Sequence, residues 1–117
     1  MREIKFRGYN FTKNKMIPFE KIRPLDYVYD GTLDEMIYGM ENHLKLMQYS
    51  GLKDKNGVEI YEGDILKLKE SKEKYEIRYL GNRFVLCKYD NIVFEDEAYF
   101  SEREVIGNIY ENRELLK

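Results

Sequence analysis

The sequence predicts a mainly β (α+β) protein, with an N-terminal β-hairpin and short helix over residues 1–50 joined to a small SH3-like β-barrel over residues 51–117. Apolar and polar residues alternate with a period of two in several short runs, which is the pattern of half-buried strands. Turn-forming Gly, Asn and Asp residues separate these runs at short intervals, as in small barrels. Because 117 residues with 43% hydrophobic content suit a single core, we expect the two lobes to form one compact unit.

The first element expected is a hairpin over residues 3–19. Ile4 and Phe6 alternate with charged residues, and a polar stretch separates them from the apolar residues that begin at Met16. Pro18 lies in the second strand, so we expect this strand to end early or to lie at a sheet edge.

A short helix over residues 33–43 is expected next, after an irregular segment at 20–31. Thr32 and Glu35 have the spacing of a capping box, in which a hydroxyl and a carboxylate satisfy backbone N–H groups. Apolar residues then recur at helical spacing. The chain is expected to continue into a strand that ends near Tyr49.

Two sharp turns are expected in the middle of the chain. Asp54 can accept hydrogen bonds from nearby N–H groups within the turn at residues 54–57, and Gly63 gives the chain freedom to bend before a strand that starts at Ile65. A Gly-Asp pair before an apolar strand is typical of SH3-like barrels. The residues assigned to structural turns are Asp54, Asn56, Gly57, Gly63, Asp64 and Gly81.

The second half predicts a β-hairpin over residues 75–86. A two-residue turn at Gly81-Asn82, of type II′ because Gly comes first, would place Tyr79 opposite Phe84. Further strands are expected at 92–94 and 105–109. A last helical turn is expected at 112–116, capped by Asn112.

Composition limits the function classes. The 20 basic and 22 acidic residues leave a net charge of −2, which argues against a broad basic surface for nucleic acid. The single Cys87 fits a reducing compartment. The sequence has neither an apolar run near 20 residues nor a signal peptide at its start, so we expect a cytoplasmic protein without membrane contact.

Four carboxylates in the middle of the chain have two interpretations. They could form a cation or acid–base site, although their spacing does not match an EF-hand loop. The alternative, which we favour, is that two of them stabilise turns and the other two are solvated. The four residues are Asp54, Glu59, Glu62 and Asp64. A magnesium site stays open by spacing alone.

No catalytic residue, metal ligand or cofactor is expected. His43 has neither a second histidine nor a cysteine pair nearby, and Cys87 lies in no recognisable catalytic or metal-binding motif. The sequence also holds no phosphate-binding glycine loop.

A strip of basic residues is the candidate contact for nucleic acid. Its members are Lys67, Lys69, Lys72, Lys74 and Arg78, interleaved with Tyr75 and Tyr79. Base stacking and phosphate contact need this mixture. Glu70, Glu73 and Glu76 lie among them, so a solvated strand is the favoured interpretation.

Three blocks carry a resemblance to a known family. They read MREIKFRGYN at the start, LMQYSGLKDKNGVEIYEGDIL in the middle and VIGNIYENRELL near the end. In this order they are similar to the YopX family of small phage and prophage proteins. The chain departs from the pattern at residues 7–9 and at Arg113. The resemblance implies a phage-borne cytoplasmic protein of the bacterial host that forms a homo-oligomer, and it implies no particular activity.

Three functional hypotheses follow. The first is a non-enzymatic phage accessory protein that acts through contacts with host or phage proteins and through self-association, since Tyr and other aromatics are enriched in interface cores. The second is a nucleic-acid-binding module on an SH3-like barrel. The third and weakest is a small enzyme that uses the carboxylates near residues 59–64.

Overall fold

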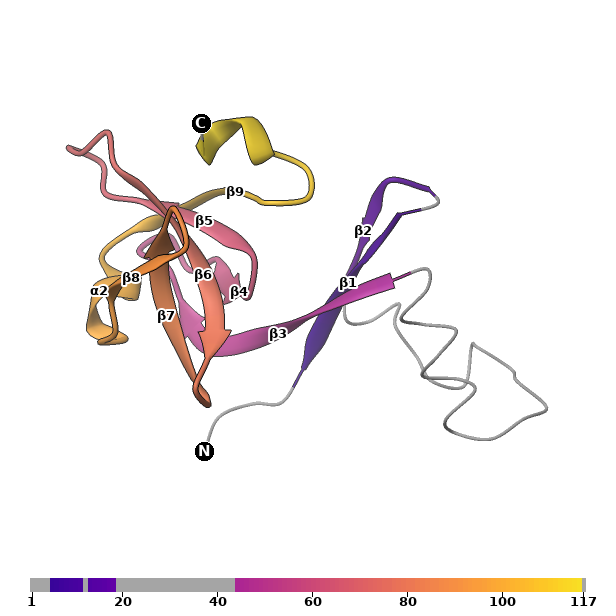
Figure 1. Ribbon diagram of the computed structural model, residues 1–117, viewed down its shortest axis with the longest axis horizontal. Helices are drawn as coiled ribbons and strands as arrows, with labels where there is room; N and C mark the ends of the chain where they lie inside the picture. Colours follow the sequence, from indigo (N-terminus) through magenta and orange to yellow (C-terminus); the bar gives the residue numbers. More distant parts are fainter. Residues whose placement is uncertain (1–4, 12, 19–43, 117) are drawn as a thin grey trace. The chain divides into compact units, whose positions relative to one another are not determined.

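The computed structural model describes residues 5–11, 13–18 and 44–116, and it shows a mainly β protein, as predicted (Figure 1). The chain divides into two compact units. The N-terminal unit is Lys5–Gln48, and the C-terminal unit consists mainly of Tyr49–Lys117. The predicted irregular segment at 20–31 and helix at 33–43 lie outside the described residues. That the two lobes form one compact unit stays a prediction.

The N-terminal unit contains the predicted hairpin. Its strands are β1 (Phe6–Asn10) and β2 (Lys15–Ile17), which pair antiparallel with Gly8 opposite Ile17. The second strand ends immediately before Pro18, whose ring nitrogen cannot donate to the ladder. β1 also pairs with the next strand, which leaves β2 as an outer strand.

β3 (Leu44–Lys53) is a ten-residue strand that runs from one unit into the other. Its first half pairs with β1, and its second half pairs with β4 (Glu59–Tyr61). The β3–β4 register shifts between Tyr49 and Lys53, which marks an irregularity of the bulge kind. The strand is therefore longer than the sequence predicted, because polar and glycine residues at its end did not stop it.

The C-terminal unit is built on a curled five-stranded antiparallel sheet with the order β8-β7-β6-β5-β9 (Figure 1). The ladder shifts register between β5 and β9 and between β7 and β8. Such shifts bend a strand and increase its twist, which accounts for the curl. The strands are β5 (Asp64–Lys67), β6 (Lys74–Leu80), β7 (Arg83–Lys88), β8 (Asn91–Phe94) and β9 (Glu104–Asn108).

The core of this unit is a cluster of fully buried apolar side chains. One comes from β4, one from β5, three from the β6–β7 hairpin and one from helix α2 (Ala98–Ser101). Half-buried apolar residues pack around it. The buried members are Ile60, Leu66, Ile77, Phe84, Leu86 and Phe100. On β7 the neighbouring Val85 and Cys87 are also buried, so both faces of this strand are covered.

The β6–β7 hairpin has the predicted register. Tyr79 lies opposite Phe84, with ring centroids 4.8 Å apart, and Ile77 lies opposite Leu86. The predicted turn type is wrong. Gly81 and Asn82 both have positive φ, at 60° and 63°, which defines a type I′ turn rather than type II′. Asn is one of the few residues other than glycine that adopts this conformation, so it serves at the second position.

We expect Gly81→Val to lower the free energy of unfolding by more than about 1 kcal/mol, since a β-branched residue resists positive φ. A Cβ added at Gly81 meets no atom within 4 Å, so backbone strain alone would cause the loss. Gly81→Asn is the control, because Asn tolerates this conformation and should cost much less. Chemical denaturation measures both, and equal stabilities for wild type and Gly81→Val would contradict the turn assignment.

The C-terminal end contains one unpredicted element and one correction. Helix α2 was not predicted, although Asp96 Oδ1 accepts a hydrogen bond of 2.9 Å from the Ala98 N–H at its start. The last helical turn is present as a 3₁₀ turn, η3 (Arg113–Leu116). Its predicted side-chain cap is wrong: Asn112 Oδ1 instead accepts the Asn108 N–H at 3.2 Å.

Candidate functional site

Asp54 organises the loop between β3 and β4. Its Oδ1 accepts hydrogen bonds from the N–H groups of Asn56 at 2.8 Å and Val58 at 2.9 Å. Its Oδ2 accepts a bond of 2.9 Å from the Val105 N–H, 51 residues further along the chain. The side chain is buried, with 6% of the residue exposed. This carboxylate therefore shapes its own turn and attaches it to β9.

Backbone bonds strengthen the same loop. The Asp54 N–H donates to the Val58 carbonyl at 2.8 Å, and the Gly57 N–H donates to the Asp54 carbonyl at 3.0 Å. Lys55 donates its N–H to the Arg103 carbonyl at 3.1 Å. Asn56 and Gly57 thus occupy a tight turn, and the loop is held against the segment that precedes β9.

The second sharp turn, at Gly63 and Asp64, joins β4 to β5. Gly63 has a φ of 89°, which other residues adopt only with strain. Asp64 is 1% exposed, and its Oδ2 accepts the Tyr61 N–H at 2.8 Å. The Gly63 N–H donates to the Ile77 carbonyl at 2.8 Å, and its carbonyl accepts the Ile109 N–H at 2.9 Å. The corner is therefore bonded to β6 on one side and to the residue that follows β9 on the other.

The four carboxylates do not converge on one point. Asp54 and Asp64 are engaged in two separate turns, and the half-buried Glu59 and Glu62 lie between them in the chain. Across residues 5–11, 13–18 and 44–116, no three His, Cys, Asp or Glu side chains gather closely enough to hold a metal ion. The geometry therefore favours a structural role for this stretch.

We expect Asp64→Ala to lower the free energy of unfolding by about 2 kcal/mol, because it leaves the buried Tyr61 N–H without its acceptor. Glu62→Gln should have a much smaller effect on stability. Magnesium should change the melting temperature of neither the wild type nor Asp64→Ala. If these carboxylates held a cation, magnesium or manganese would instead raise the melting temperature of the wild type but not that of Asp64→Ala. Thermal melts with and without metal measure the difference.

The basic strip is spread over different environments. The Lys67 ammonium donates to the Leu68 carbonyl at 3.1 Å and the Lys69 carbonyl at 3.3 Å, within the loop between β5 and β6. Arg78 lies between Glu76 and Asp90, at 3.1 and 2.8 Å. Lys69 and Lys72 are exposed, and Lys74 is half-buried at the start of β6. Two of the five cations are thus engaged with groups of the chain itself.

The aromatic partners of the strip are also engaged. The Tyr75 ring lies 5.4 Å from Phe94, at a near-perpendicular angle of 80°. Tyr79 packs against Phe84 and is 37% exposed. Each ring is thus already in contact with a phenylalanine of the core sheet, and of the two only Tyr79 is exposed enough to meet a base.

Arg103 is a buried cation that the sequence did not single out. It is 3% exposed, and its guanidinium carbon lies 4.8 Å from the ring centroid of Phe94, 5.6 Å from Tyr75 and 5.8 Å from Tyr99. Its Nη1 donates to the Tyr99 carbonyl at 2.6 Å and pairs with Glu102 at 3.1 Å. Since its ring partners come from three segments, Arg103 connects β6, β8 and α2.

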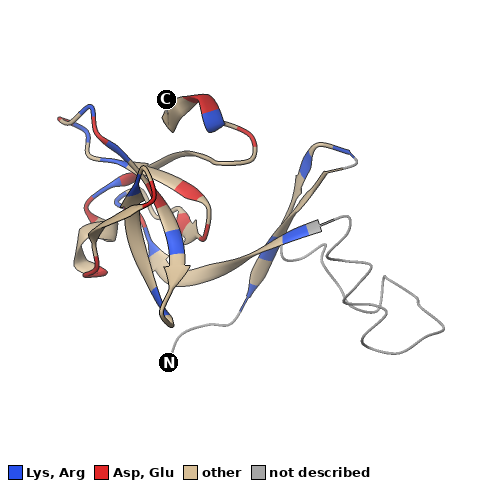
Figure 2. Ribbon diagram, viewed as in Figure 1, with Lys and Arg blue, Asp and Glu red and all other residues tan. Residues whose placement is uncertain are grey.

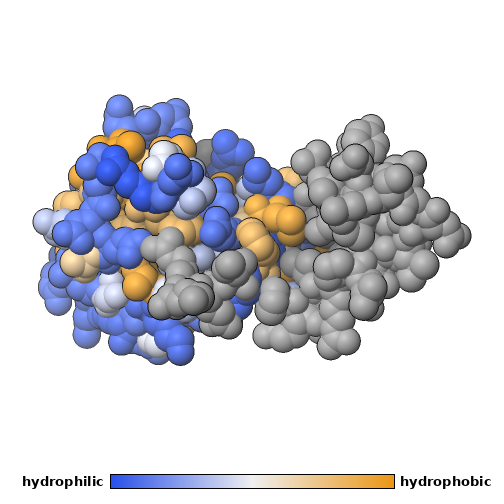
Figure 3. Space-filling view, turned by 90° about the horizontal axis from the view of Figure 1, so that it is seen from below, coloured by the Kyte–Doolittle hydropathy of each residue, from blue (hydrophilic) through white to orange (hydrophobic). Residues whose placement is uncertain are grey.

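An open hollow of about 570 Å³ is lined in part by Phe94 and Tyr99, the rings of which lie near the Arg103 guanidinium. Its lining residues come from β8, from α2 and from the link between them. We name it the β8–α2 surface, and it consists of Ile92, Val93, Phe94, Glu95, Asp96 and Tyr99. Ile92, Val93 and Tyr99 are 44%, 43% and 41% exposed. Figure 3 shows that apolar side chains reach the surface among mostly hydrophilic ones on the face in view.

The β8–α2 surface is also acidic. Residues 89–104 contain six carboxylates and one cationic side chain, which is the buried Arg103. Some of this charge is compensated, since Glu95 pairs with Arg83 at 2.8 Å and Asp90 pairs with Arg78. The sequence signal was visible as an Ile-Val-Phe run followed by Glu-Asp-Glu, but it was interpreted only as a strand.

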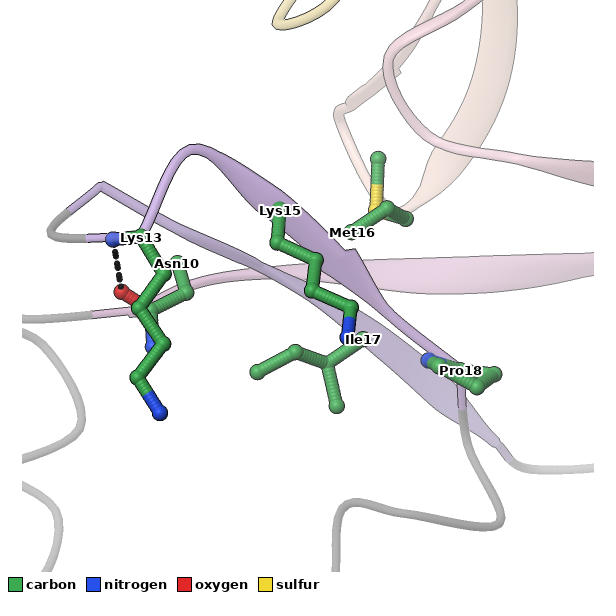
Figure 4. Close-up of a pocket in the computed structure, with 6 residues that line it drawn as sticks. All are labelled: Asn10, Lys13, Lys15, Met16, Ile17 and Pro18. Carbon is green, nitrogen blue, oxygen red and sulfur yellow. Dashed lines mark hydrogen bonds between the residues drawn. The ribbon is translucent and has the colours of Figure 1, made fainter.

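The N-terminal unit carries a second hollow beside β2 (Figure 4). Lys15 and Ile17 extend on one side of the hairpin in this view and Met16 extends on the other, as expected for alternating strand residues. The Lys13 N–H donates to Asn10 Oδ1 at 3.0 Å. We name this the hairpin surface, and it consists of Asn10, Lys13, Lys15, Met16, Ile17 and Pro18.

Cys87 on β7 lies opposite Glu76 on β6, as the register of the predicted hairpin requires. Burial raises the pKa of its thiol above the ordinary value, although the nearby Arg78 acts in the opposite direction. A buried thiol with a raised pKa is mostly protonated at neutral pH, and the thiol is a weak nucleophile in that form. Cys87 therefore acts as a packing residue.

The fold and its turns define a small, mainly β protein in which two buried aspartates, Asp54 and Asp64, stabilise turns. The sequence model of the YopX protein family matches residues 5–117, and the chain belongs to this family. The crystal structure of protein EF1440 from Enterococcus faecalis is similar, with a TM-score of 0.68 and 28% sequence identity over 100% of both chains. A comparison with curated proteins found no match.

Within the segments that the structure describes, no helix is long and apolar enough to cross a membrane.

Proposed function

We propose that the chain is a phage-encoded accessory protein that acts in the host cytoplasm through protein contacts, including contacts with further copies of itself, and without catalysis. Its membership of the YopX family supports the phage origin, which the blocks at both ends and in the middle of the sequence imply. The curled five-stranded sheet and its sharp Gly63-Asp64 corner are consistent with an SH3-like barrel as the scaffold.

The observation that carries this proposal is the β8–α2 surface. Three large apolar side chains there are each more than 40% exposed, and Tyr89, in the turn that precedes β8, is 75% exposed. Clustered exposed apolar residues with a polar margin are characteristic of protein interaction sites. The carboxylates at Glu95 and Asp96 supply such a margin.

The alternative is a nucleic-acid-binding module that uses the basic strip. The exposed Lys69 and Lys72 are available for phosphates, whereas Lys67 and Arg78 bond to the chain itself. A gel shift at low salt tests it, since binding through phosphates weakens steeply as salt rises. If the wild type binds DNA or RNA and the double variant with Lys69→Glu and Lys72→Glu does not, nucleic-acid binding is favoured over protein contacts.

Self-association is tested by light scattering coupled to size-exclusion chromatography over a range of concentrations. We expect a mass that rises above the 14.2 kDa of one chain as the concentration increases, because the interface includes exposed apolar area. If the mass stays at that of one chain up to about millimolar concentration, self-association is contradicted. A dissociation constant of about 1 mM already corresponds to only about 4 kcal/mol of binding free energy.

A further inference from the structure

Among the outer strands of the two sheets that the structure describes, β8 and β2 each have backbone groups that face away from their sheet. β8 is the outer strand of the five-stranded sheet, and β2 is the outer strand beside β1, with no other described strand paired to either. Outer strands are sites where an extended segment can add to a sheet.

The register shows which backbone groups of β8 are directed outward. Tyr89 and Asp90 both have positive φ and form a two-residue turn closed by Lys88 opposite Asn91. Pairs in an antiparallel ladder alternate between hydrogen-bonded and non-hydrogen-bonded. Since the closing pair is hydrogen-bonded, the next residue, Ile92, directs its N–H and carbonyl away from β7.

The two outer strands are opposite in charge. The described residues of the N-terminal unit carry five cationic side chains and no carboxylate, and Lys13 and Lys15 at β2 are exposed. The β8–α2 surface is flanked by carboxylates instead, of which Asp90 and Glu95 also pair with Arg78 and Arg83. Figure 2 shows the contrast, with only blue among the charged positions of β1, β2 and the start of β3, and red on the turns beside α2.

The two strands also match in length and in apolar content. β8 has four residues and β2 has three, so each can form a short ladder with the other. Ile92 and Val93 are exposed on β8, and Met16 and Ile17 are half-buried on β2. Pairing the strands would remove apolar area from water on both sides.

We propose that β2 of one copy adds to the β8 edge of a second copy, with Lys13 and Lys15 placed against the carboxylates that flank β8. The proposal rests on the proposed self-association and names its interface. Contact between two β8 edges would bring carboxylates together, and contact between two β2 edges would bring lysines together, so like charges disfavour both alternatives.

Charge reversal on each side tests the contact. The hairpin variant carries Lys13→Glu and Lys15→Glu, and the loop variant carries Glu95→Lys and Glu97→Lys. Asp96 is left intact because it bonds the Ala98 N–H at the start of α2. Each variant alone should associate at least about tenfold more weakly than the wild type, since both create like-charge contacts.

An equimolar mixture of the two variants should recover association. The reversed hairpin of one then meets the reversed loop of the other, and the two native surfaces also meet. Misfolding of either variant cannot produce this recovery, so light scattering on the mixture separates a lost contact from a damaged fold.

A matched pair of apolar substitutions tests the strand itself. Ile92→Lys should weaken association by at least about tenfold, because it places a cation against the lysines of β2. Leu80→Lys is the control, since Leu80 is 41% exposed against 44% for Ile92 but lies at the end of the β6–β7 hairpin. It should leave association unchanged.

Four outcomes decide between this proposal and the broader one. A wild type that stays monomeric overturns self-association and this interface together. Association that persists in both charge variants, or that Leu80→Lys weakens as much as Ile92→Lys, keeps self-association and overturns the β2–β8 contact. Loss in each variant without recovery in the mixture also overturns it.

Discussion

Replacing Asp54 by alanine is expected to lower the free energy of unfolding by about 3 kcal/mol or more, because three backbone N–H groups lose their acceptor at once. The donors are Asn56, Val58 and Val105, each within 2.9 Å of the carboxylate. The site is nearly closed to water, so solvent cannot replace all three bonds. Chemical denaturation in urea, with an unchanged dependence on denaturant, measures the loss.

Two further variants separate the contributions of this carboxylate. Asp54→Asn retains an oxygen for Asn56 and Val58 but places an amide N–H₂ against the Val105 N–H, so it should lose about 1 to 2 kcal/mol. Asp96→Ala is the matched control, because Asp96, like Asp54, accepts a hydrogen bond from the N–H two residues further along the chain. Its single bond is exposed, so it should cost about 1 kcal/mol or less.

The ordering of these variants decides whether Asp54 joins two parts of the unit. If Asp54→Ala costs no more than Asp96→Ala, the bond to β9 contributes nothing and the residue only stabilises its local turn. If Asp54→Asn equals the wild type, the Val105 bond is dispensable even though it spans 51 residues.

Local signals in the sequence predicted local structure well. The β6–β7 hairpin and its register follow from the spacing of Tyr79, Phe84 and the turn between them. The turn type was wrong because Gly at the first position was taken to require positive φ only there. Asn82 also adopts positive φ. Whether a two-residue turn is of type I′ or type II′ depends on how the twist of the turn matches that of the strands.

Contacts between distant segments were outside the reach of the sequence. Asp54 was predicted to stabilise a turn, but no local pattern could show that its second oxygen reaches Val105. The burial of Arg103 likewise depends on rings at positions 75, 94 and 99. An arginine between two glutamates has the appearance of a solvated charge, and only the fold places it under aromatic side chains.

Helix α2 was missed for a related reason. Four helical residues are too few to show a period of 3.6, so periodicity could not find them. Its buried Phe100 completes the apolar core, so a short element with little intrinsic stability is held in place by packing. Its position also determines the β8–α2 surface, which explains why that surface could not be predicted from the sequence.

Arg103→Ala is expected to lower the free energy of unfolding by about 3 kcal/mol, since it leaves a cavity beside three aromatic rings and removes the cation that contacts them. Phe94, whose ring centroid is 4.8 Å from the guanidinium carbon, loses the closest contact. Tyr99 also loses the 2.6 Å hydrogen bond to its carbonyl. Because Phe94 and Tyr99 line the β8–α2 surface, we expect their side chains to become less ordered as well.

Conservative variants show whether the planar guanidinium itself is needed. Arg103→Lys keeps the charge but replaces the flat group by a compact ammonium that cannot stack on the rings, so it should still lose about 2 kcal/mol. Glu102→Gln, which alters the exposed partner of the same arginine, should lose less than about 1 kcal/mol, because its side chain is 54% exposed and the pair is screened. Urea denaturation and near-ultraviolet circular dichroism of the tyrosines measure both effects. If Arg103→Lys is as stable as the wild type, the positive charge alone is sufficient. If Glu102→Gln is as unstable as Arg103→Ala, the stabilisation comes from the ion pair rather than from the aromatic contacts.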